Sequence, residues 1–195
     1  MDFAARITRL PLPVDSARGQ SALEATGIAD PRLGDLIRGT AGCSPYLAGL
    51  ILHEADWLAE ALTHEDVVAR ETAGFESLSA DDLGPALRRA KRRVALWTAL
   101  ADLGGVWRLE QVTGALTDLA DRASDLALRV HVAAERARGK LPATDADSGG
   151  IVALAMGKMG AGELNYSSDI DLIVLYDDSA YARDDQHEAR ASLIR

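Results

Sequence analysis

The chain has 195 residues and a formal net charge of −9, with 48% hydrophobic and 5% aromatic residues. This length can bury a sizeable core in one or two domains, and the abundance of alanine and leucine favours helices. An acidic chain repels phosphate backbones, so we expect no nucleic-acid partner held by charge. A nucleotide bound through a metal ion stays open, because the metal supplies the positive charge.

A single cysteine, Cys43, excludes an internal disulfide and favours a reducing compartment. The first residues, MDFAARITRLPLP, lack the apolar core of a signal peptide. The stretch YLAGLIL at residues 46–52 is far shorter than the roughly 20 residues that cross a bilayer. We therefore expect a cytoplasmic protein without membrane association.

The N-terminal half carries helix signals of increasing strength. Residues 1–34 contain several prolines and glycines and predict an irregular lead-in that can include a short helix. Ser44-Pro45 predicts a helix start, with serine as N-cap and proline at the first helical position. The apolar residues that follow fall roughly on one helical face: Leu47, Leu50, Ile51, Leu58 and Leu62.

Two longer helices are predicted next. One begins near Pro85 and ends at Gly104-Gly105, and the other runs from Leu109 to about Arg138. Apolar residues recur in both at steps of three and four, which gives each helix one apolar stripe. Such stripes must pack on neighbours, so residues 44–138 predict a helical bundle.

The hydrophobic period changes after this point. GKLPATDADSGG, from residue 139, has the composition of a loop, while IVALAM (151–156) and IDLIVLY (170–176) suit buried strands. DDQHEARASLIR at the end predicts a helix. We expect a mainly α fold with a helical region at 1–140, a linker at 141–150, and an α/β domain at 151–195 that is incomplete at its C-terminal end.

Two carboxylates, Asp169 and Asp171, stand at the start of the second predicted strand. Residues two apart in a strand point to the same side, so the two carboxylates are expected to project together. Mg²⁺ prefers carboxylate oxygens and completes its shell with water and substrate phosphates. The pair therefore predicts a catalytic metal site.

A glycine-rich turn precedes the pair. Gly157, Gly160 and Gly162 allow the backbone to approach a ligand closely, and amides of a following short helix can hold a phosphate. Lys158 either contacts that phosphate or is simply exposed beside it. A D-x-D pair alone is a common surface feature. Together with this turn, it favours metal-assisted transfer at a nucleotide phosphorus.

The string AMGKMGAGELNYSSDIDLIVLYD resembles the signature of the glutamine synthetase adenylyltransferases. These are bifunctional enzymes of the DNA-polymerase-β-like nucleotidyltransferase superfamily. Other stretches resemble the same family in the same order: AARITRLPLP, GCSPYLAGLILHEADWL and LRRAKRRVALWTALADLGGVWRLEQVTGALTDLAD. The resemblance implies the N-terminal portion of a longer chain that has two nucleotidyltransferase domains.

The ELNYSSD copy in that family removes AMP. Inorganic phosphate attacks the AMP–tyrosine link on glutamine synthetase and ADP is released, whereas the second copy adds AMP from ATP. The resemblance thus implies Mg²⁺, ATP or ADP and phosphate as ligands, and glutamine synthetase and a PII-type signal protein as partners. It makes Asp169 and Asp171 metal ligands, and it places Gly157, Lys158 and Ser168 at the phosphate-binding turn. Glu163 and Asn165 belong to the signature without an assigned role.

Two departures from the family pattern bear on activity. Ala161 replaces a glycine found in many members, which matters only if that position needs a positive φ. The superfamily also has a third carboxylate on a later strand, and the acidic residues after the second predicted strand lie too close to serve: Asp177, Asp178, Asp184 and Asp185. The isolated segment is expected to be inactive. The alternatives are a non-catalytic module that binds glutamine synthetase or a PII-type protein, and another nucleotidyltransferase.

The remaining motifs favour structural interpretations. RRAKRR (88–93) is interpreted as the solvated face of a helix rather than a contact with phosphate or glutamine synthetase. Cys43 is expected to be buried and inert, and the histidines have no metal-ligand spacing. The tryptophans are predicted to pack in cores: Trp57, Trp97 and Trp107.

Overall fold

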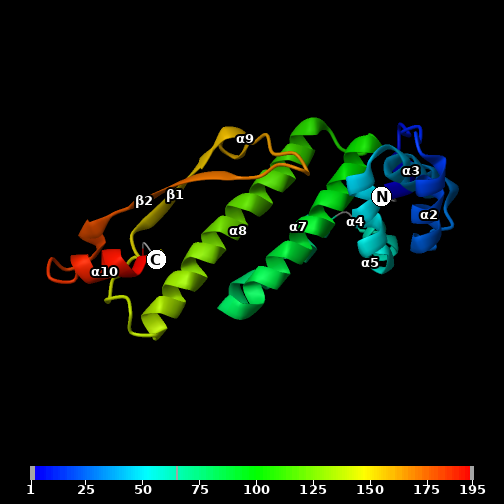
Figure 1. Ribbon diagram of the computed structural model, residues 1–195. Coiled ribbons are helices and arrows are strands. Elements are labelled where there is room, and N and C mark those ends of the chain that lie inside the picture. Colours follow the sequence, from blue (N-terminus) through cyan, green and yellow to red (C-terminus); the bar gives the residue numbers. More distant parts are fainter. Residues whose placement is uncertain (1–2, 65, 194–195) are drawn as a thin grey trace. The chain divides into compact units, whose positions relative to one another are not determined.

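The computed structural model describes residues 3–64 and 66–193 and is mainly helical, with a small two-stranded sheet (Figure 1). The first helices are short: α1 (Phe3–Arg6), α2 (Ser16–Thr26), α3 (Pro31–Cys43), α4 (Pro45–His53), α5 (Ala55–Ala61) and α6 (Val67–Thr72). Two long helices follow, α7 (Ala80–Leu103) and α8 (Leu109–Ala137). The C-terminal part contains β1 (Ile151–Met156), α9 (Gly157–Gly160), β2 (Asp171–Tyr176) and α10 (Gln186–Leu193). No helix in the described ranges is long and apolar enough to cross a membrane.

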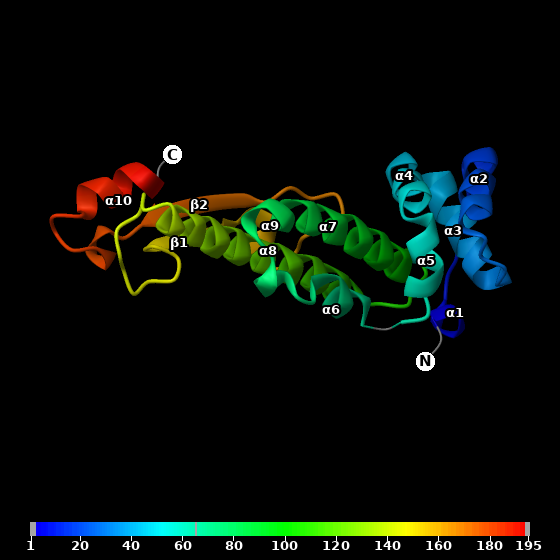
Figure 2. The same cartoon turned by 90° about the horizontal axis from the view of Figure 1, so that it is seen from below.

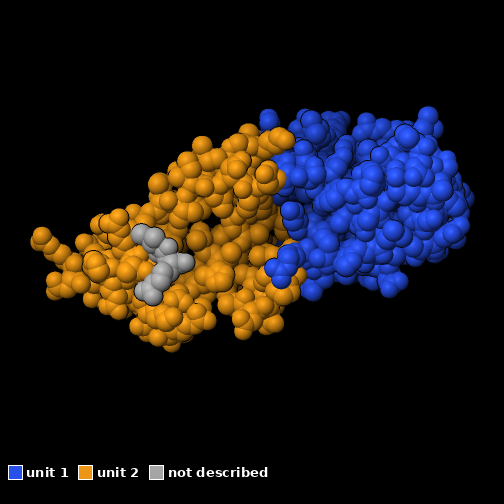
Figure 3. Space-filling model, in the orientation of Figure 1, with its two compact units in different colours: residues 1–73, 88–117, 163–168 blue, residues 74–87, 118–162, 169–195 orange. Residues whose placement is uncertain are grey.

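The chain forms two compact units (Figure 3). Unit 1 consists of residues 1–73, 88–117 and 163–168, and unit 2 consists of residues 74–87, 118–162 and 169–195. The long helices α7 and α8 each contribute one part to each unit. The contacts of the predicted helical bundle at 44–138 are therefore divided between both units.

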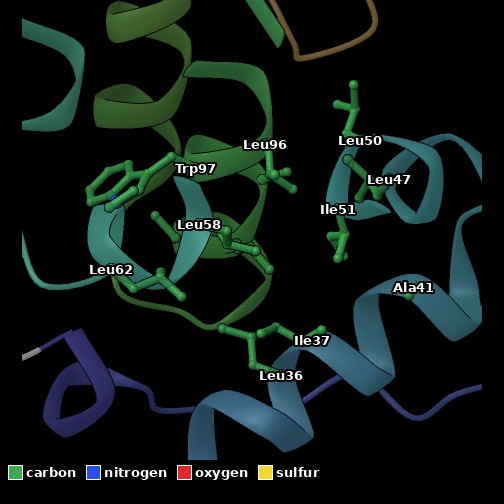
Figure 4. Close-up of a cluster of buried hydrophobic side chains, with 14 of the residues drawn as sticks. Leu36, Ile37, Ala41, Leu47, Leu50, Ile51, Leu58, Leu62, Leu96 and Trp97 are labelled. Carbon is green, nitrogen blue, oxygen red and sulfur yellow. The ribbon is translucent and has the colours of Figure 1, made fainter. Parts of the chain in front are cut away.

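Unit 1 has a large apolar core built by α3, α4, α5 and the second half of α7 (Figure 4). Leu36 and Ile37 from α3 and Leu58 from α5 are completely buried. Trp97 from α7 is 1% exposed, and its ring meets Phe3 and Trp107 edge-on at centroid distances of 5.5 and 4.7 Å. Edge-to-face aromatic pairs add to the stabilisation that burial alone provides.

Within residues 3–34 the chain forms α1, α2 and the start of α3, so the prediction of an irregular lead-in is wrong for these helices and holds for the stretch at 7–15 between α1 and α2. The side chain of Asp15 caps α2 by accepting a hydrogen bond from the Arg18 amide, and Asp30 caps α3 through the Leu33 amide. Gly27 ends α2 in the left-handed conformation. These caps give short helices defined ends, and Figure 2 shows α2 and α3 side by side.

The start of α4 and the range of α8 agree with those predicted from the sequence, whereas the start of α7 differs. Ser44 caps α4 as predicted, and its hydroxyl accepts from the Leu47 amide at 3.2 Å. Helix α8 also covers the expected range. Helix α7 instead starts five residues before Pro85, because Ser79 accepts a hydrogen bond from the Asp82 amide and begins the helix there. Pro85 lies inside the helix.

Strands β1 and β2 pair antiparallel, with Ile151 opposite Tyr176 and Met156 opposite Asp171 (Figure 1). Both strands were predicted, but the expectation that they are buried is wrong. In β1 the side chains alternate between half-buried and exposed, and in β2 all but Tyr176 are exposed. The pair has two free edges in the described chain, and its outward face leaves Leu154 and Ile173 44% and 45% exposed.

A smaller core lies in unit 2. Val132 of α8, Leu141, Tyr181 and Ala189 are buried together. Leu141 belongs to the predicted linker, and the Tyr181 hydroxyl donates to the carbonyl of Gly149 at 3.0 Å. The segment between α8 and β1 is therefore held within unit 2 near both of its ends.

Candidate active site

The glycine turn follows directly on β1. Gly157 has a φ of +55°, a conformation that side-chain-bearing residues rarely adopt, and it begins the four-residue helix α9. A Cβ at Gly160 would collide with the carbonyl oxygen of Ala155, so α9 can fold back onto the end of β1 only with glycine at this position. The order predicted from the sequence, strand, glycine turn, short helix and strand, is confirmed.

Ala161 is compatible with this turn. Its φ of −85° lies in the right-handed helical region, and no described residue other than glycine has a positive φ. The alanine therefore introduces no backbone strain where many relatives are expected to have glycine.

Asp171 lies beside the turn. It is the first residue of β2 and pairs with Met156, the last residue of β1. A Cβ at Gly157 would stand 3.5 Å from the Oδ2 atom of Asp171, so this carboxylate and the glycine are direct neighbours. The missing side chain leaves the space next to the carboxylate open.

Asp169 lies two residues before β2 begins, so the argument that strand alternation aligns it with Asp171 does not apply. Both carboxylates are exposed, and within the described chain neither forms an ion pair with a lysine or arginine. No described group of three acidic, histidine or cysteine side chains could hold a metal. Two open carboxylates do match the oxygen ligands of Mg²⁺, which takes water and phosphate oxygens for its other positions.

The signature residues 163–168 belong to unit 1, whereas the turn and Asp169 belong to unit 2. This loop is closed by its own polar groups. The Oδ1 atom of Asn165 accepts from the amide and the hydroxyl of Ser167, both at 3.0 Å. The hydroxyl of Ser168 accepts from the Asn165 amide at 3.2 Å. Asn165 had no predicted role, although asparagine favours turns in which its side chain accepts from the backbone two residues further on.

The predicted phosphate ligands lie in two different parts of the chain. Gly157, Lys158 and Gly160 lie together in the turn, while Ser168 is held within the loop of unit 1. Lys158 is exposed and forms no ion pair within the described residues. Both alternatives for Lys158, phosphate contact and simple exposure, therefore stay open.

A second polar group lies in unit 1, at the end of the basic run. Arg92 and Arg93 donate to the two oxygens of Glu54 at 2.9 and 2.8 Å, and Arg93 also pairs with Glu71 at 3.2 Å. Burial of the Glu54 carboxyl acts to raise its pKa, but the hydrogen bonds and charges of Arg93 and Arg92 outweigh it and lower the pKa. These two arginines are thus structural.

The other three basic residues of the run are exposed. Arg88, Arg89 and Lys91 point away from the buried residues of α7, as expected for a solvated helix face. The tryptophan prediction is confirmed, since Trp97 is buried and Trp57 and Trp107 pack against the same core.

The prediction that Cys43 is buried is wrong. The residue is exposed, and its thiol donates to the carbonyl of Leu12 at 2.9 Å. It is the last residue of α3 and follows the buried residues Ala41 and Gly42. Of the histidines, His53, His131 and His187 are exposed and His64 is half-buried.

A glycine turn beside an unpaired carboxylate at a strand start is typical of proteins that bind phosphate groups through a metal ion. Residues 35–195 match the family model described as glutamate-ammonia ligase adenylyltransferase (GlnE). The chain belongs to this family, whose members are nucleotidyltransferases.

The relatives are much longer proteins. The bifunctional glutamine synthetase adenylyltransferase/adenylyl-removing enzyme of Rhodopseudomonas palustris is 44% identical over 176 residues, which cover 84% of this chain and 18% of the relative. The enzyme of the same name from Caulobacter vibrioides is 40% identical over 189 residues, covering 92% of this chain and 19% of the relative. The chain thus spans about a fifth of these relatives. No solved structure matches it.

Proposed function

We propose that this chain forms part of the adenylyl-removing half of an enzyme that regulates glutamine synthetase. We propose that this regulating enzyme is cytoplasmic and acts in nitrogen metabolism. In the proposed reaction inorganic phosphate attacks the phosphorus of an adenylyl-tyrosine, the tyrosine oxygen leaves, and ADP is the product. The companion activity, addition of AMP from ATP, is assigned to a different part of the longer enzyme. The proposal rests on the ELNYSSD signature and on the printed names of the relatives.

The observation that carries the proposal is the open carboxylate beside the glycine turn. Asp171 is exposed next to Gly157 and has no cationic partner in the described part of the chain. Asp169 and Asp171 would hold Mg²⁺, which when bound polarises phosphoryl oxygens and offsets their charge.

The turn would hold the phosphate groups. Gly157 and Gly160 are exposed, so their backbone amides are proposed to bind a phosphate, and the exposed Lys158 would add a positive charge. Ser168 is proposed as a phosphate ligand on the family resemblance alone, and its hydroxyl accepts a hydrogen bond from the Asn165 amide. The helix α9 has four residues, so we assign the binding to local amides and not to a helix dipole.

Glutamine synthetase is the proposed protein substrate, since the names of the relatives specify it. A PII-type signal protein is the proposed regulator. The exposed basic residues Arg88, Arg89 and Lys91 are available to such partners but are not required by the proposal.

The test is Asp171→Asn in the full natural protein that carries this chain. Removal of AMP from adenylylated glutamine synthetase, followed as phosphate-dependent ADP release, should fall by at least about 100-fold, because loss of even an outer-shell metal contact costs 10- to 100-fold. The circular dichroism spectrum should be unchanged. Asp184→Asn is the matched control, because it neutralises an exposed carboxylate of the same unit. Undiminished AMP removal by Asp171→Asn would refute the assignment.

One observation favours a second function for the isolated segment. In the described ranges no third acidic, histidine or cysteine ligand joins the two aspartates. A non-catalytic module that binds glutamine synthetase or a PII-type protein would need none. Calorimetric titration of the segment with ADP and Mg²⁺ separates the two functions, because such a module should bind no nucleotide.

A further inference from the structure

The glycine turn at residues 157–162 has little conformational restraint of its own. Gly157 and Gly162, at its two ends, have φ values of +55° and +73°, and a third glycine lies between them. Glycine loses more backbone freedom on folding than any other residue, so this segment is costly to hold in one conformation. Between described residues, the hydrogen bonds of the turn are internal, such as those from the amides of Ala161 and Gly162 to the carbonyls of Gly157 and Met159. The attachment of the turn to the rest of unit 2 therefore depends on packing.

Met159 provides the buried side chain of this turn. It is 4% exposed, whereas its neighbours Lys158 and Gly160 are exposed. Among residues 157–162, all of which the structure describes, Met159 alone is buried. Burial of a methionine side chain is strongly stabilising, and the unbranched thioether adapts to irregular space. Met159 is therefore the residue that can hold the turn in place.

The inward face of β1 has room for this side chain. Ala153 and Ala155 occupy the half-buried positions of the strand nearest the turn, and both are small. Together with Leu172 of β2, they and Met159 line a cavity of about 360 Å³ within unit 2. Leu172 directly follows Asp171. Met159 thus faces the same space as both strands of the hairpin, next to the residue that follows the candidate metal ligand.

We infer that Met159 is a positioning residue for the candidate active site: its buried side chain holds the glycine turn against the hairpin and so keeps the amides of the turn beside Asp171. The inference rests on the proposed function for its catalytic consequence, whereas the anchoring itself does not. Groups that are held in the productive geometry before a ligand arrives bind it better than groups that must first be ordered. Met159 should therefore affect the use of phosphate through the turn.

Backbone order parameters from NMR relaxation of this chain test the anchoring. In Met159→Ala the order parameters of residues 157–162 should fall from about 0.85, the value of rigid backbone, to below about 0.6. Met159→Leu should keep the wild-type values, because leucine is apolar and similar in volume. Leu154→Ala is the matched control. It truncates an apolar side chain of the same unit that is 44% exposed, so it should leave the turn ordered.

Two NMR results would overturn the inference. One is an order of residues 157–162 that is the same in Met159→Ala as in the wild type. The other is an equal loss of order throughout both strands and α8, because that would show a general loss of structure in unit 2 rather than release of the turn.

Kinetics of the full natural protein test the catalytic consequence. Met159→Ala should raise KM for inorganic phosphate about 3- to 10-fold and leave KM for adenylylated glutamine synthetase within about twofold, because the loss concerns phosphate binding and not binding of the protein substrate. Met159→Leu should restore KM for phosphate to within about twofold of the wild type. An unchanged KM for phosphate together with a released turn would refute the positioning role. An inactive wild-type protein would refute the proposed function alone, since the order parameters do not depend on activity.

Discussion

The core of unit 1 and the hairpin of unit 2 differ in how far they bury their apolar side chains. In unit 1, side chains from α3, α4, α5 and α7 exclude water almost completely (Figure 4). In the hairpin, apolar side chains of similar size are about half exposed, for example Val152 at 53% and Leu175 at 50%. The candidate metal ligand Asp171 is on the hairpin, while the loop preceding Asp169 is anchored in unit 1.

This difference in burial indicates which part of the chain contributes most stability and which part offers exposed groups to a ligand. Burial of apolar surface is the main stabilising contribution in proteins, so unit 1 should account for most of the stability. A two-stranded hairpin is marginally stable by itself. The exposed strand ends, however, are what leave carboxylates free for a ligand. Three substitutions test this division.

The largest effect is expected from Trp97→Ala. The residue is 1% exposed and contacts Phe3 and Trp107, so the truncation should cost about 3–5 kcal/mol of unfolding free energy. Urea denaturation followed by circular dichroism measures it. Trp97→Phe is the control. It keeps an aromatic ring and removes a buried indole N–H that has no hydrogen-bond partner among the described residues, so it should cost much less. Equal costs would contradict a tightly packed core.

An intermediate effect is expected from Glu54→Gln. The change leaves Arg92 and Arg93 without their shared partner in a mostly buried site, which should cost about 1–3 kcal/mol. Glu60→Gln in the same unit is the control, because Glu60 pairs with His64 and Arg70 at the surface and such pairs contribute about 0–1 kcal/mol.

The same residue predicts a pH dependence. The folded-state pKa of Glu54 is below the ordinary value of 4.5, so its contribution to stability is complete above that pH and is lost as the pH falls through the lowered pKa. The groups facing it are Arg92, Arg93 and His53. Urea titrations across this acidic range should show a shallower loss of stability in Glu54→Gln than in the wild type. Identical slopes would exclude Glu54 as the source.

The smallest effect is expected from Val152→Thr on the exposed face of β1. Threonine has the same shape and suits strands, and the residue is 53% exposed, so the change should cost less than about 0.5 kcal/mol. Val94→Thr makes the same chemical change at a fully buried position of α7 and should cost about 1–3 kcal/mol. If both changes cost the same, the contrast between core and hairpin does not hold.

Much of the local structure was predictable from the sequence. Ser44-Pro45 and the apolar stripe of α8 indicated their helices, and β1 was predicted with its exact boundaries. The family was readable as well, from a string of residues that contains the glycine turn and the two aspartates. Helix caps, apolar periods and glycine positions are encoded by neighbouring residues, which is why sequence analysis finds them.

Contacts between distant residues were decided only by the tertiary structure. Arg92 and Arg93 looked like part of a solvated run, but Glu54 lies 38 and 39 positions away and pairs with both. Strand β2 looked buried, yet no described element covers its outward face. The hydroxyl of Tyr46 donates to the carbonyl of Tyr166, which lies 120 positions away in the sequence. Such outcomes depend on which surfaces meet when the chain folds, and no local pattern records that choice.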